Sequence, residues 1–597
     1  MLLALSLACI SFSGCSGIGN SKSVSLTTKY LASSENTITV YAEVSDSDDS
    51  ESSDEASSTG ETVTIGDETY EIYGDIPRGT EVYYETDVNL GGSEDSDNNY
   101  AKIYFEASTD NPCYVPVENV VDSINDICLE TAKYVRTPVT VYENNSGAKI
   151  AGMANKGAEL EILGYSTLYS DGSVEKYNVS LTGTDLTGYV YSKYLVDTEE
   201  EANAVYESIA SIHSDRTYSG SDLMGGSAAN LDWYPYYKTV IEGNDFCTEA
   251  KTMYLNATAA CDNASYLELI KSHGINAVVI DIKDGQLSYP AEIAQEMSPS
   301  SYENAYTTEE DFNEAIQAFK DAGVYVIGRI VCFNDSYFAS DNPDTCIDSP
   351  ESTTAWPSAY SRTAWEYNVG LAVESVEKFG FNEIQFDYVR FPENAYAMSQ
   401  DSATDYKNKY NEEKCQAIQN FCFYAADTLH EAGAYISVDV FGECADTYVT
   451  AYGQYWPAIS MIVDAISGMP YTDHYGSSEN TWEYPYAIVH TFAKRAAARQ
   501  SEIETPASVR TWITGYDTPN WDPDIDYGYK MLSQQINALY NEGLTGGFIP
   551  WNGSSNVSKY EEYSEIWDTE YPNSDEILTP DTASDASGTP YYVDSAS

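Results

Sequence analysis

Positive charge is scarce in this sequence. Its 597 residues include 29 Lys and Arg against 95 Asp and Glu, a formal net charge of −66. A surface of this sign repels phosphate groups, so nucleic acids and anionic bilayers are disfavoured as partners. The acidity bears on solubility and says little about the fold. A chain of this length exceeds what one hydrophobic core supports, so we expect several domains.

Three signatures of cofactor sites are also lacking. The cysteines form no Cys-x-x-Cys pair and no Cys/His pattern of a zinc site. No glycine-rich phosphate loop follows any expected strand, so no nucleotide cofactor is indicated. A metal ion is not required either, although Asp281 and Asp284 leave room for one. We therefore expect chemistry carried by side chains alone.

No stretch of the sequence is apolar over a length that would span a bilayer. The shorter run from Met1 to Cys15 resembles the hydrophobic region of a secretory signal. Its end, Phe-Ser-Gly-Cys15, resembles a bacterial lipobox, although Phe replaces the usual Leu and no Lys or Arg precedes the run. The prediction is an extracellular protein, anchored to the cell membrane as a lipoprotein through a lipid on Cys15.

The N-terminal third is expected to hold a stalk and small β domains. Residues 16–62 are rich in Ser, Asp, Glu and Thr and predict a disordered acidic stalk. A faint internal repeat follows, in which Arg78–Tyr84 parallels Lys156–Ile162. The short alternating strands resemble bacterial SH3-like domains, clearly over residues 133–197 and as a weaker, degenerate copy over residues 63–125. The resemblance implies binding to peptidoglycan or another wall polymer, with a role as spacer as the alternative.

From residue 251 the pattern changes to strands that alternate with amphipathic helices, as in parallel α/β folds. Eight such units over residues 251–568 predict a (β/α)8 TIM barrel with insertions. The expected fold class is therefore α/β, a TIM barrel preceded by one or two small all-β SH3-like barrels. Residues 198–250 would supply a connecting helix and a lead-in, and residues 569–597 a disordered tail. The expected strands are 252–256, 277–283, 324–331, 383–389, 435–441, 465–471, 509–515 and 547–551.

The most informative segment is Glu383–Pro392. Ile384 and Phe386 alternate with Gln385 and Asp387, which is the period of a strand with one polar face. The proline at the end of the segment cannot donate to a sheet, so the strand must end before it. Asp387 is thereby expected at the C-terminal mouth of the barrel, where barrel enzymes keep their chemistry.

The same alternation sorts the charged residues of the neighbouring strands. It places Asp281 and Lys283 on the inner face of the second strand, Arg329 on that of the third and Asp439 on that of the fifth. Aromatic residues would wall this mouth. Trp512 and Trp551 close strands seven and eight, and Tyr471 and His474 lie in the loop after strand six.

Glycoside hydrolysis requires at least two carboxyl groups, which here would face each other across the barrel. We predict Asp387 as the nucleophile or base and Asp439 as the acid, with Glu443 as the alternative acid. Cations beside one carboxylate would keep it ionised. The residues expected to bind substrate or tune charge are Asp281, Lys283, Arg329, Arg390, Tyr471, His474, Trp512 and Trp551.

These segments also resemble a known family. Asn276–Asp284, the FDYVRFP segment at Phe386–Pro392 and Asp439–Gly442 are similar to the bacterial putative glycoside hydrolase barrel family, over about residues 250–560. The resemblance implies a TIM barrel that acts on polysaccharide, with the nucleophile after strand four at Asp387. The chain departs from the family at Ile513-Thr514 and at Gly468, which affects the expected substrate contacts more than the paired acids.

Two other functions stay open. One is a non-catalytic polysaccharide- or cell-wall-binding protein on a degenerate barrel, and the other is a wall-associated scaffold in which the SH3-like pair does the work. Purely structural roles for the candidate site residues also stay open. Asp387 with Arg390 could be a structural ion pair, Asp439 could anchor loops by hydrogen bonds, and Asp281 with Lys283 could only fix the inner polar layer of the barrel.

Overall fold

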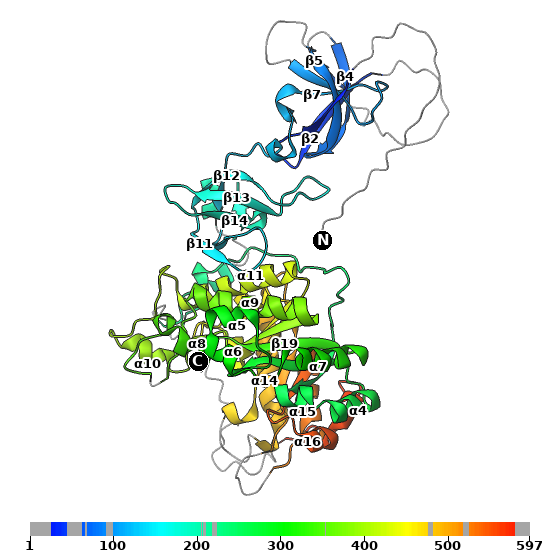
Figure 1. Ribbon diagram of the computed structural model, residues 1–597. Helices are drawn as coiled ribbons and strands as arrows, with labels where there is room; N and C mark the ends of the chain where they lie inside the picture. The colour runs from blue at the N-terminus through cyan, green and yellow to red at the C-terminus, as the bar shows by residue number, and fades with distance from the viewer. Residues whose placement is uncertain are drawn as a thin grey trace. The chain divides into compact units, whose positions relative to one another are not determined.

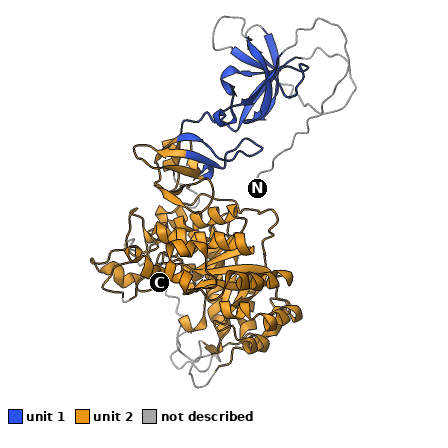
Figure 2. Ribbon diagram, in the orientation of Figure 1, with its two compact units in different colours: residues 1–132, 162–178, 191–193 blue, residues 133–161, 179–190, 194–597 orange. Residues whose placement is uncertain are grey.

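The computed structural model describes residues 25–44, 62–65, 68–90, 99–204, 206, 211–217, 224–352, 354–475, 482–517 and 525–579. The chain divides into two compact units (Figure 2). One holds residues 1–132, 162–178 and 191–193, and the other holds residues 133–161, 179–190 and 194–597. The predicted signal segment with Cys15 lies outside the described residues. Within the described ranges, no helix combines the length and apolarity that crossing a bilayer needs.

The first sheet belongs to the N-terminal unit and is drawn in blue in Figure 1. Its strand order is β3-β4-β2-β7-β6-β5-β1-β8. Leu31, Val40, Val82 and Val115 are fully buried in its core. The strands are β1 (Thr27–Leu31), β2 (Thr37–Glu43), β3 (Thr62–Ile65), β4 (Glu68–Pro77), β5 (Glu81–Asn89), β6 (Asn99–Tyr104), β7 (Cys113–Pro116) and β8 (Val120–Val121).

Strands β1 and β2 correct the prediction of a disordered stalk over residues 16–62. Within that range, residues 25–44 form two strands of the first sheet, where β2 pairs with β4 and β7. Ile38 and Val40 alternate with polar residues and are buried, which is the period of a strand with one face on a core. The Ser- and Asp-rich neighbours lowered the average hydrophobicity and concealed this short pattern.

A second sheet follows over residues 132–196, in the order β11-β10-β14-β13-β12-β9-β15. Both N-terminal segments are therefore all-β, as expected, whereas their SH3-like identity stays a prediction. The expected connecting helix begins as α1 (Glu199–Asn203), which ends because Ala204 is extended, and residues 211–213 are helical again. The strands are β9 (Ala132–Val135), β10 (Val139–Tyr142), β11 (Ile150–Ala154), β12 (Glu159–Tyr165), β13 (Lys176–Leu181), β14 (Thr187–Tyr191) and β15 (Leu195–Val196).

The barrel is built from parallel strands in the order β22-β21-β20-β19-β17-β16-β25, with β23 and β24 at the two ends. Only Arg510 separates β23 from β24, so one chain segment pairs with β22 on one side and β25 on the other and brings the ring together. The expected TIM-barrel fold is confirmed. The strands are β16 (Ala250–Leu255), β17 (Ala277–Asp284), β19 (Tyr325–Val331), β20 (Glu383–Asp387), β21 (Tyr435–Phe441), β22 (Ala465–Met469), β23 (Ser508–Val509), β24 (Thr511–Thr514) and β25 (Gly547–Trp551), with β18 (Gln286–Leu287) antiparallel to β17.

Helices cover the outside of these strands (Figure 1). In α9, for example, Ser361 caps the first turn by accepting the Ala364 N–H, and Gly380 in the left-handed region ends the helix. The helices of the barrel are α3 (Ala257–Cys261), α4 (Ala264–Ser272), α5 (Glu292–Met297), α6 (Pro299–Glu303), α7 (Glu309–Asp321), α8 (Ser336–Asp341), α9 (Arg362–Phe379), α10 (Ala395–Gln400), α11 (Lys414–Glu431), α12 (Trp456–Ser460), α14 (Pro485–Gln500), α15 (Tyr529–Asn541) and α16 (Val557–Glu562).

The start of the predicted disordered tail is ordered, which corrects the prediction over residues 569–579. Asn573 exchanges hydrogen bonds with Asn537 of α15, and the Leu578 N–H donates to Gln534 on the same helix. Tyr571 packs against Tyr540 and Phe548. The polar composition of the segment concealed these contacts, because side-chain amides and a single aromatic ring attach it. Residues 580–597 lie outside the described residues.

Candidate active site

Four neighbouring strands bring charged side chains to one point inside the barrel. Arg329 of β19 lies between Asp281 of β17 and Asp387 of β20, with its Nη1 2.7 Å from Asp281 Oδ1 and its Nη2 2.7 Å from Asp387 Oδ2. Its Nε lies 3.2 Å from Asp387 Oδ2 and 3.9 Å from Asp439 Oδ2 of β21. The acids at the ends of the fourth and fifth strands therefore converge on one guanidinium group.

Three aromatic side chains surround this cluster. The Tyr254 hydroxyl donates to Asp281 Oδ2, and the Trp512 Nε1–H donates to Asp439 Oδ1 at 2.8 Å. The Trp551 ring lies 4.7 Å from that of Tyr254 and 5.4 Å from that of Trp512, and the Arg329 guanidinium is 5.4 Å from the Trp551 centroid. Trp551 is half-buried, so it offers part of an apolar face at the edge of the cluster.

The cluster contains more carboxyl groups than cations. The exposed Asp284 also approaches Arg329, at 3.4 Å, so one guanidinium faces three buried carboxyl groups and a fourth at the solvent edge. Burial raises the pKa of Asp281 to about 6; Arg329 opposes this shift and Asp284 adds to it. Burial, reinforced by the negative charge of Asp387, raises the pKa of Asp439 well above its ordinary value. The arrangement favours a proton on Asp439.

The two central acids differ in their surroundings. Asp387 is 5% exposed, and its second oxygen, Oδ1, accepts the Tyr388 N–H at 2.6 Å. Tyr388 adopts a φ of 53°, a region that bulky residues rarely occupy, and this turn directs its N–H back to the carboxylate. Asp439 is 0% exposed, and its Oδ2 has no hydrogen-bond partner among the described residues. Asp439 thus lies on the inner face of its strand, as expected, and is buried more completely than Asp387.

Lys283 does not join the cluster, which corrects its expected inward position. A bulge in the β17–β19 pairing, between Asp281 and Lys283, sets Lys283 opposite Ile330 and reverses the alternation. The ammonium group instead donates to Asp335 at 2.6 Å and to Asn368 of α9 at 2.8 Å. Lys283 therefore belongs to a buried structural pair on the helix side of the strand.

Arg390 and Glu443 lie on the other side of Asp387, near the ends of β20 and β21. Arg390 donates to Glu393 at 3.0 Å and stacks on the rings of Phe441 and Tyr388, so its ion pair is with Glu393, whereas Arg329 pairs with Asp387. Glu443 is half-buried and accepts hydroxyl hydrogen bonds, each 2.8 Å, from Tyr448 and Tyr452. Glu443, the alternative acid, is therefore more exposed than Asp439.

Tyr471 and His474 follow β22. Tyr471 is buried and belongs to the same apolar cluster as Trp512 and Tyr254. The His474 ring is exposed and lies 5.4 Å from that of Tyr471 and 6.0 Å from that of Phe441. His474 therefore belongs to the rim, away from the carboxyl groups. Tyr254 was missed from the sequence, although its alternation with the apolar Met253 and Leu255 was the signal that could have found it.

No set of three or more His, Cys, Asp or Glu side chains in the described part of the chain is arranged to hold a metal ion. Arg329 occupies the centre of the carboxyl cluster, where a cation would otherwise be needed to balance charge. What the arrangement can do chemically follows from the two acids: a charged carboxylate held by a guanidinium, and a buried carboxyl group with a raised pKa beside it.

The family described as "Putative glycosyl hydrolase domain" matches residues 252–557. The chain belongs to this family. The matched range contains every residue of the carboxyl cluster and its aromatic wall, and none of the two N-terminal sheets. No curated protein matches the sequence.

Solved structures with similarity to this member of the glycosyl hydrolase family include three bacterial proteins. A hypothetical protein from Ruminiclostridium thermocellum is 29% identical over 32% of this chain and 97% of that one, with a TM-score of 0.26. The PgaB (BpsB) glycoside hydrolase domain from Bordetella bronchiseptica is 13% identical over 53% and 97%, with a TM-score of 0.40. The C-terminal domain of a chitinase-like protein from Desulfitobacterium hafniense is 12% identical over 54% and 98%, with a TM-score of 0.36.

Proposed function

We propose that the protein is a glycosidase that cleaves an extracellular or cell-wall polysaccharide with Asp387 and Asp439. The observation that carries the proposal is that Arg329 pairs with Asp387 at 2.7 Å, while Asp439 lies completely buried 3.9 Å from the same guanidinium, where burial raises its pKa. Glycoside hydrolysis needs this division, because one group must be ionised and the other must donate a proton. Membership of the glycosyl hydrolase family supports the reaction class.

In the proposed reaction Asp439 donates its proton to the glycosidic oxygen as the bond from that oxygen to the anomeric carbon breaks. The Asp387 carboxylate either attacks the anomeric carbon or removes a proton from the attacking water. In both cases one water molecule is consumed and Asp439 is reprotonated by the end of the cycle. Trp551 would stack on the sugar ring, and the Trp512 indole N–H would stabilise Asp439 after proton transfer.

A second candidate is a polysaccharide-binding protein on a degenerate barrel, and the complete burial of Asp439 favours it. The two are separated by screening the full chain against a panel of polysaccharides for release of reducing ends, beside the Asp387→Asn variant. A glycosidase loses at least about a thousandfold in turnover in the variant while polysaccharide binding persists. Binding by both proteins, without products from either, would establish the second candidate.

Export with a lipid anchor on Cys15, and binding of wall polymer by the N-terminal sheets, also stand as proposals. Both rest on the sequence: the lipobox-like segment before Cys15 and the strand pattern that resembles SH3-like domains. Cys15→Ala should release the protein from the membrane fraction. If the variant fractionates like the unaltered protein, Cys15 does not carry a lipid anchor. Sedimentation of the full chain with purified peptidoglycan tests the second proposal.

A further inference from the structure

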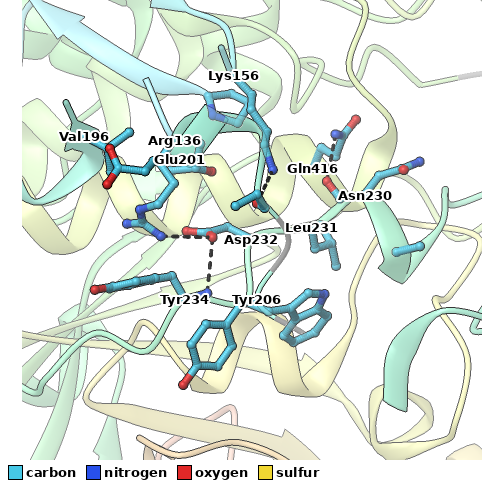
Figure 3. A pocket seen from close by; sticks show the side chains of 15 residues that line it. Arg136, Lys156, Val196, Glu201, Tyr206, Asn230, Leu231, Asp232, Tyr234 and Gln416 are labelled. Atoms are coloured by element: carbon cyan, nitrogen blue, oxygen red, sulfur yellow. Dashed lines mark hydrogen bonds and ion pairs between the residues drawn. The ribbon is translucent and has the colours of Figure 1, made fainter. Parts of the chain in front are cut away.

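A cavity of about 550 Å³ is lined by residues outside the carboxyl cluster, and Figure 3 shows its lining. Its lining comes from loops that follow strands of the second sheet (Arg136 after β9, Lys156 after β11), from α1 (Glu201), from the lead-in segment 229–234 and from Gln416 in the first turn of α11. None of the four charged residues around Arg329 contributes to it. Helix α11 ends just before β21 begins, so its first turn lies at the barrel end where β20 delivers Asp387.

The lead-in is held rigidly against α11, so the cavity has a fixed wall. The Asp232 N–H donates to Gln419 Oε1 at 2.8 Å, and Gln419 Nε2 donates back to the Asp232 carbonyl at 2.9 Å. Gln416 donates to the Asn230 carbonyl at 3.1 Å. A site whose wall is fixed before binding loses little conformational entropy when a ligand enters.

Two tyrosine rings form one side of the cavity (Figure 3). Tyr234 is 44% exposed, and the Arg136 guanidinium covers it at 3.7 Å from the ring centroid. Arg136 is itself fixed by Tyr236 at 2.6 Å and by Asp232 at 3.4 Å. The Tyr206 ring lies 5.8 Å from that of Tyr234, and its hydroxyl donates to Glu504. The result is a rigid aromatic surface that remains partly open to solvent.

The charge of the lining indicates what kind of ligand fits. Two acidic side chains, Glu201 and Asp232, face two basic ones, Arg136 and Lys156, so the cavity is balanced although the chain carries −66. Lys156 is exposed, and its ammonium group donates to the Ala204 carbonyl at 3.4 Å. Aromatic faces beside short polar groups suit a neutral ring with apolar faces and hydroxyl groups at its edge.

We propose that this cavity binds a neutral saccharide and holds a stretch of the polysaccharide away from the bond that is cleaved. The inference rests on the proposed function, because the saccharide is part of the same polymer. Tyr234 supplies the stacking surface, and Arg136 keeps its ring in place. The exposed Lys156 ammonium group has donors beyond its bond to Ala204 and would donate them to hydroxyl groups at the edge of the sugar ring.

The test is affinity gel electrophoresis of the full chain in hydroxyethylcellulose, galactomannan and glycol chitin, with polygalacturonate as the anionic comparison. At least one neutral polymer should retard the chain, and Tyr234→Ala should weaken that affinity about tenfold. Tyr234→Phe keeps the ring and should stay near wild type. The matched control is Tyr237→Ala, because Tyr237 is 93% exposed and does not line the cavity.

A second variant guards against a Tyr234→Ala protein that fails to fold. Ala204→Trp places a bulky ring at an exposed position of the lining and should weaken binding by blocking the cavity without removing a contact. The inference is overturned if no neutral polymer retards the chain, if only polygalacturonate does, or if the cavity variants bind like Tyr237→Ala.

Turnover separates this inference from the proposed function. On a polymer that the protein cleaves, Tyr234→Ala should raise KM about tenfold and leave kcat unchanged, because the reacting groups lie elsewhere. If Tyr234→Ala cleaves the polymer with an unchanged KM, the proposed role of the cavity is wrong and the proposed glycosidase activity stands. If binding depends on Tyr234 but no polymer is cleaved, the proposed glycosidase activity is wrong and the protein is a saccharide-binding protein.

Discussion

The carboxyl cluster inside the barrel and the cavity outside it are made from the same parts. Each has a buried arginine that pairs with an aspartate and lies against aromatic rings: Arg329 with Asp387 and Trp551, and Arg136 with Asp232 and Tyr234. They differ in charge balance. Four carboxyl groups surround Arg329, whereas basic and acidic side chains are equal in number around the cavity.

That difference separates a place suited to reaction from a place suited to binding. An excess of buried carboxyl groups favours a proton on one of them, and burial together with the charge of Asp387 raises the pKa of Asp439. A proton held at neutral pH on a group with a raised pKa can be donated. The contribution of the balanced Arg136–Asp232 pair is instead to fix the position of an aromatic ring.

The largest expected effect comes from removing each arginine in turn. Arg329→Gln leaves Asp387 and Asp281 without their cation, so we expect turnover to fall at least about a thousandfold. Arg136→Gln should leave kcat on a short oligosaccharide near wild type and weaken only the affinity for polymer. Steady-state kinetics of both variants on one substrate make the comparison. Equal losses of kcat would show that the two sites do not divide reaction from binding.

Lys283→Met tests the correction made by the β17 bulge. Because Lys283 and Asp335 form a buried pair, the substitution leaves an uncompensated carboxylate and should destabilise the fold by about 3–5 kcal/mol. Adding Asp335→Asn, which keeps an oxygen to cap α8, should restore part of the loss. Urea unfolding measures both. If the variant keeps its stability but has a strongly raised KM, Lys283 contacts substrate and the structural assignment is wrong.

The stability of the barrel should depend on the pH through Asp281. Its carboxyl group titrates near pH 4 when unfolded and at a pKa of about 6 when buried. As the pH rises, the folded chain therefore holds this proton to a higher pH than the unfolded chain does. The stabilisation present below pH 4, about 3 kcal/mol of unfolding free energy, is lost as the pH rises through 6. Asp281→Asn should flatten this slope in urea unfolding between pH 4 and 7. A steeper or unaltered slope would contradict the shift.

Trp551→Ala should have the smallest effect, an increase of about tenfold in KM on a short substrate, because a half-buried ring at the edge of the cluster is lost. Trp551→Phe should recover part of it. The same substitution should not alter the Tyr234-dependent affinity for polymer in gel electrophoresis. If it did, the mouth and the cavity would have to be treated as one continuous site.

The barrel and the centre of its mouth could be predicted because they follow from alternation along strands. Asp281, Arg329, Asp387 and Asp439 each stand at a position whose neighbours are apolar, and parallel strands deliver such positions to one interior. The same rule failed at Lys283, because a bulge shifts the pairing by one residue without any change in composition.

Other features depend on contacts between distant segments and left little trace in the sequence. The cavity joins residues of the second sheet, the lead-in and α11, which are separated by up to 280 positions between Arg136 and Gln416. Strands β1 and β2 were concealed because polar neighbours surround their few apolar residues. The balance of charge around each arginine likewise requires the folded arrangement, since it depends on which carboxyl groups come within a few ångströms.

The most direct test compares two leaving groups in the Asp439→Asn variant, once the polysaccharide panel has identified the sugar. An aryl glycoside with an activated leaving group needs no proton, whereas an oligosaccharide does. We predict that the variant loses at least about a hundredfold in kcat/KM on the oligosaccharide and little on the activated glycoside, while Glu443→Gln affects the two substrates alike. Equal losses on both substrates in Asp439→Asn, or a selective loss in Glu443→Gln, would contradict the assignment of Asp439 as the acid.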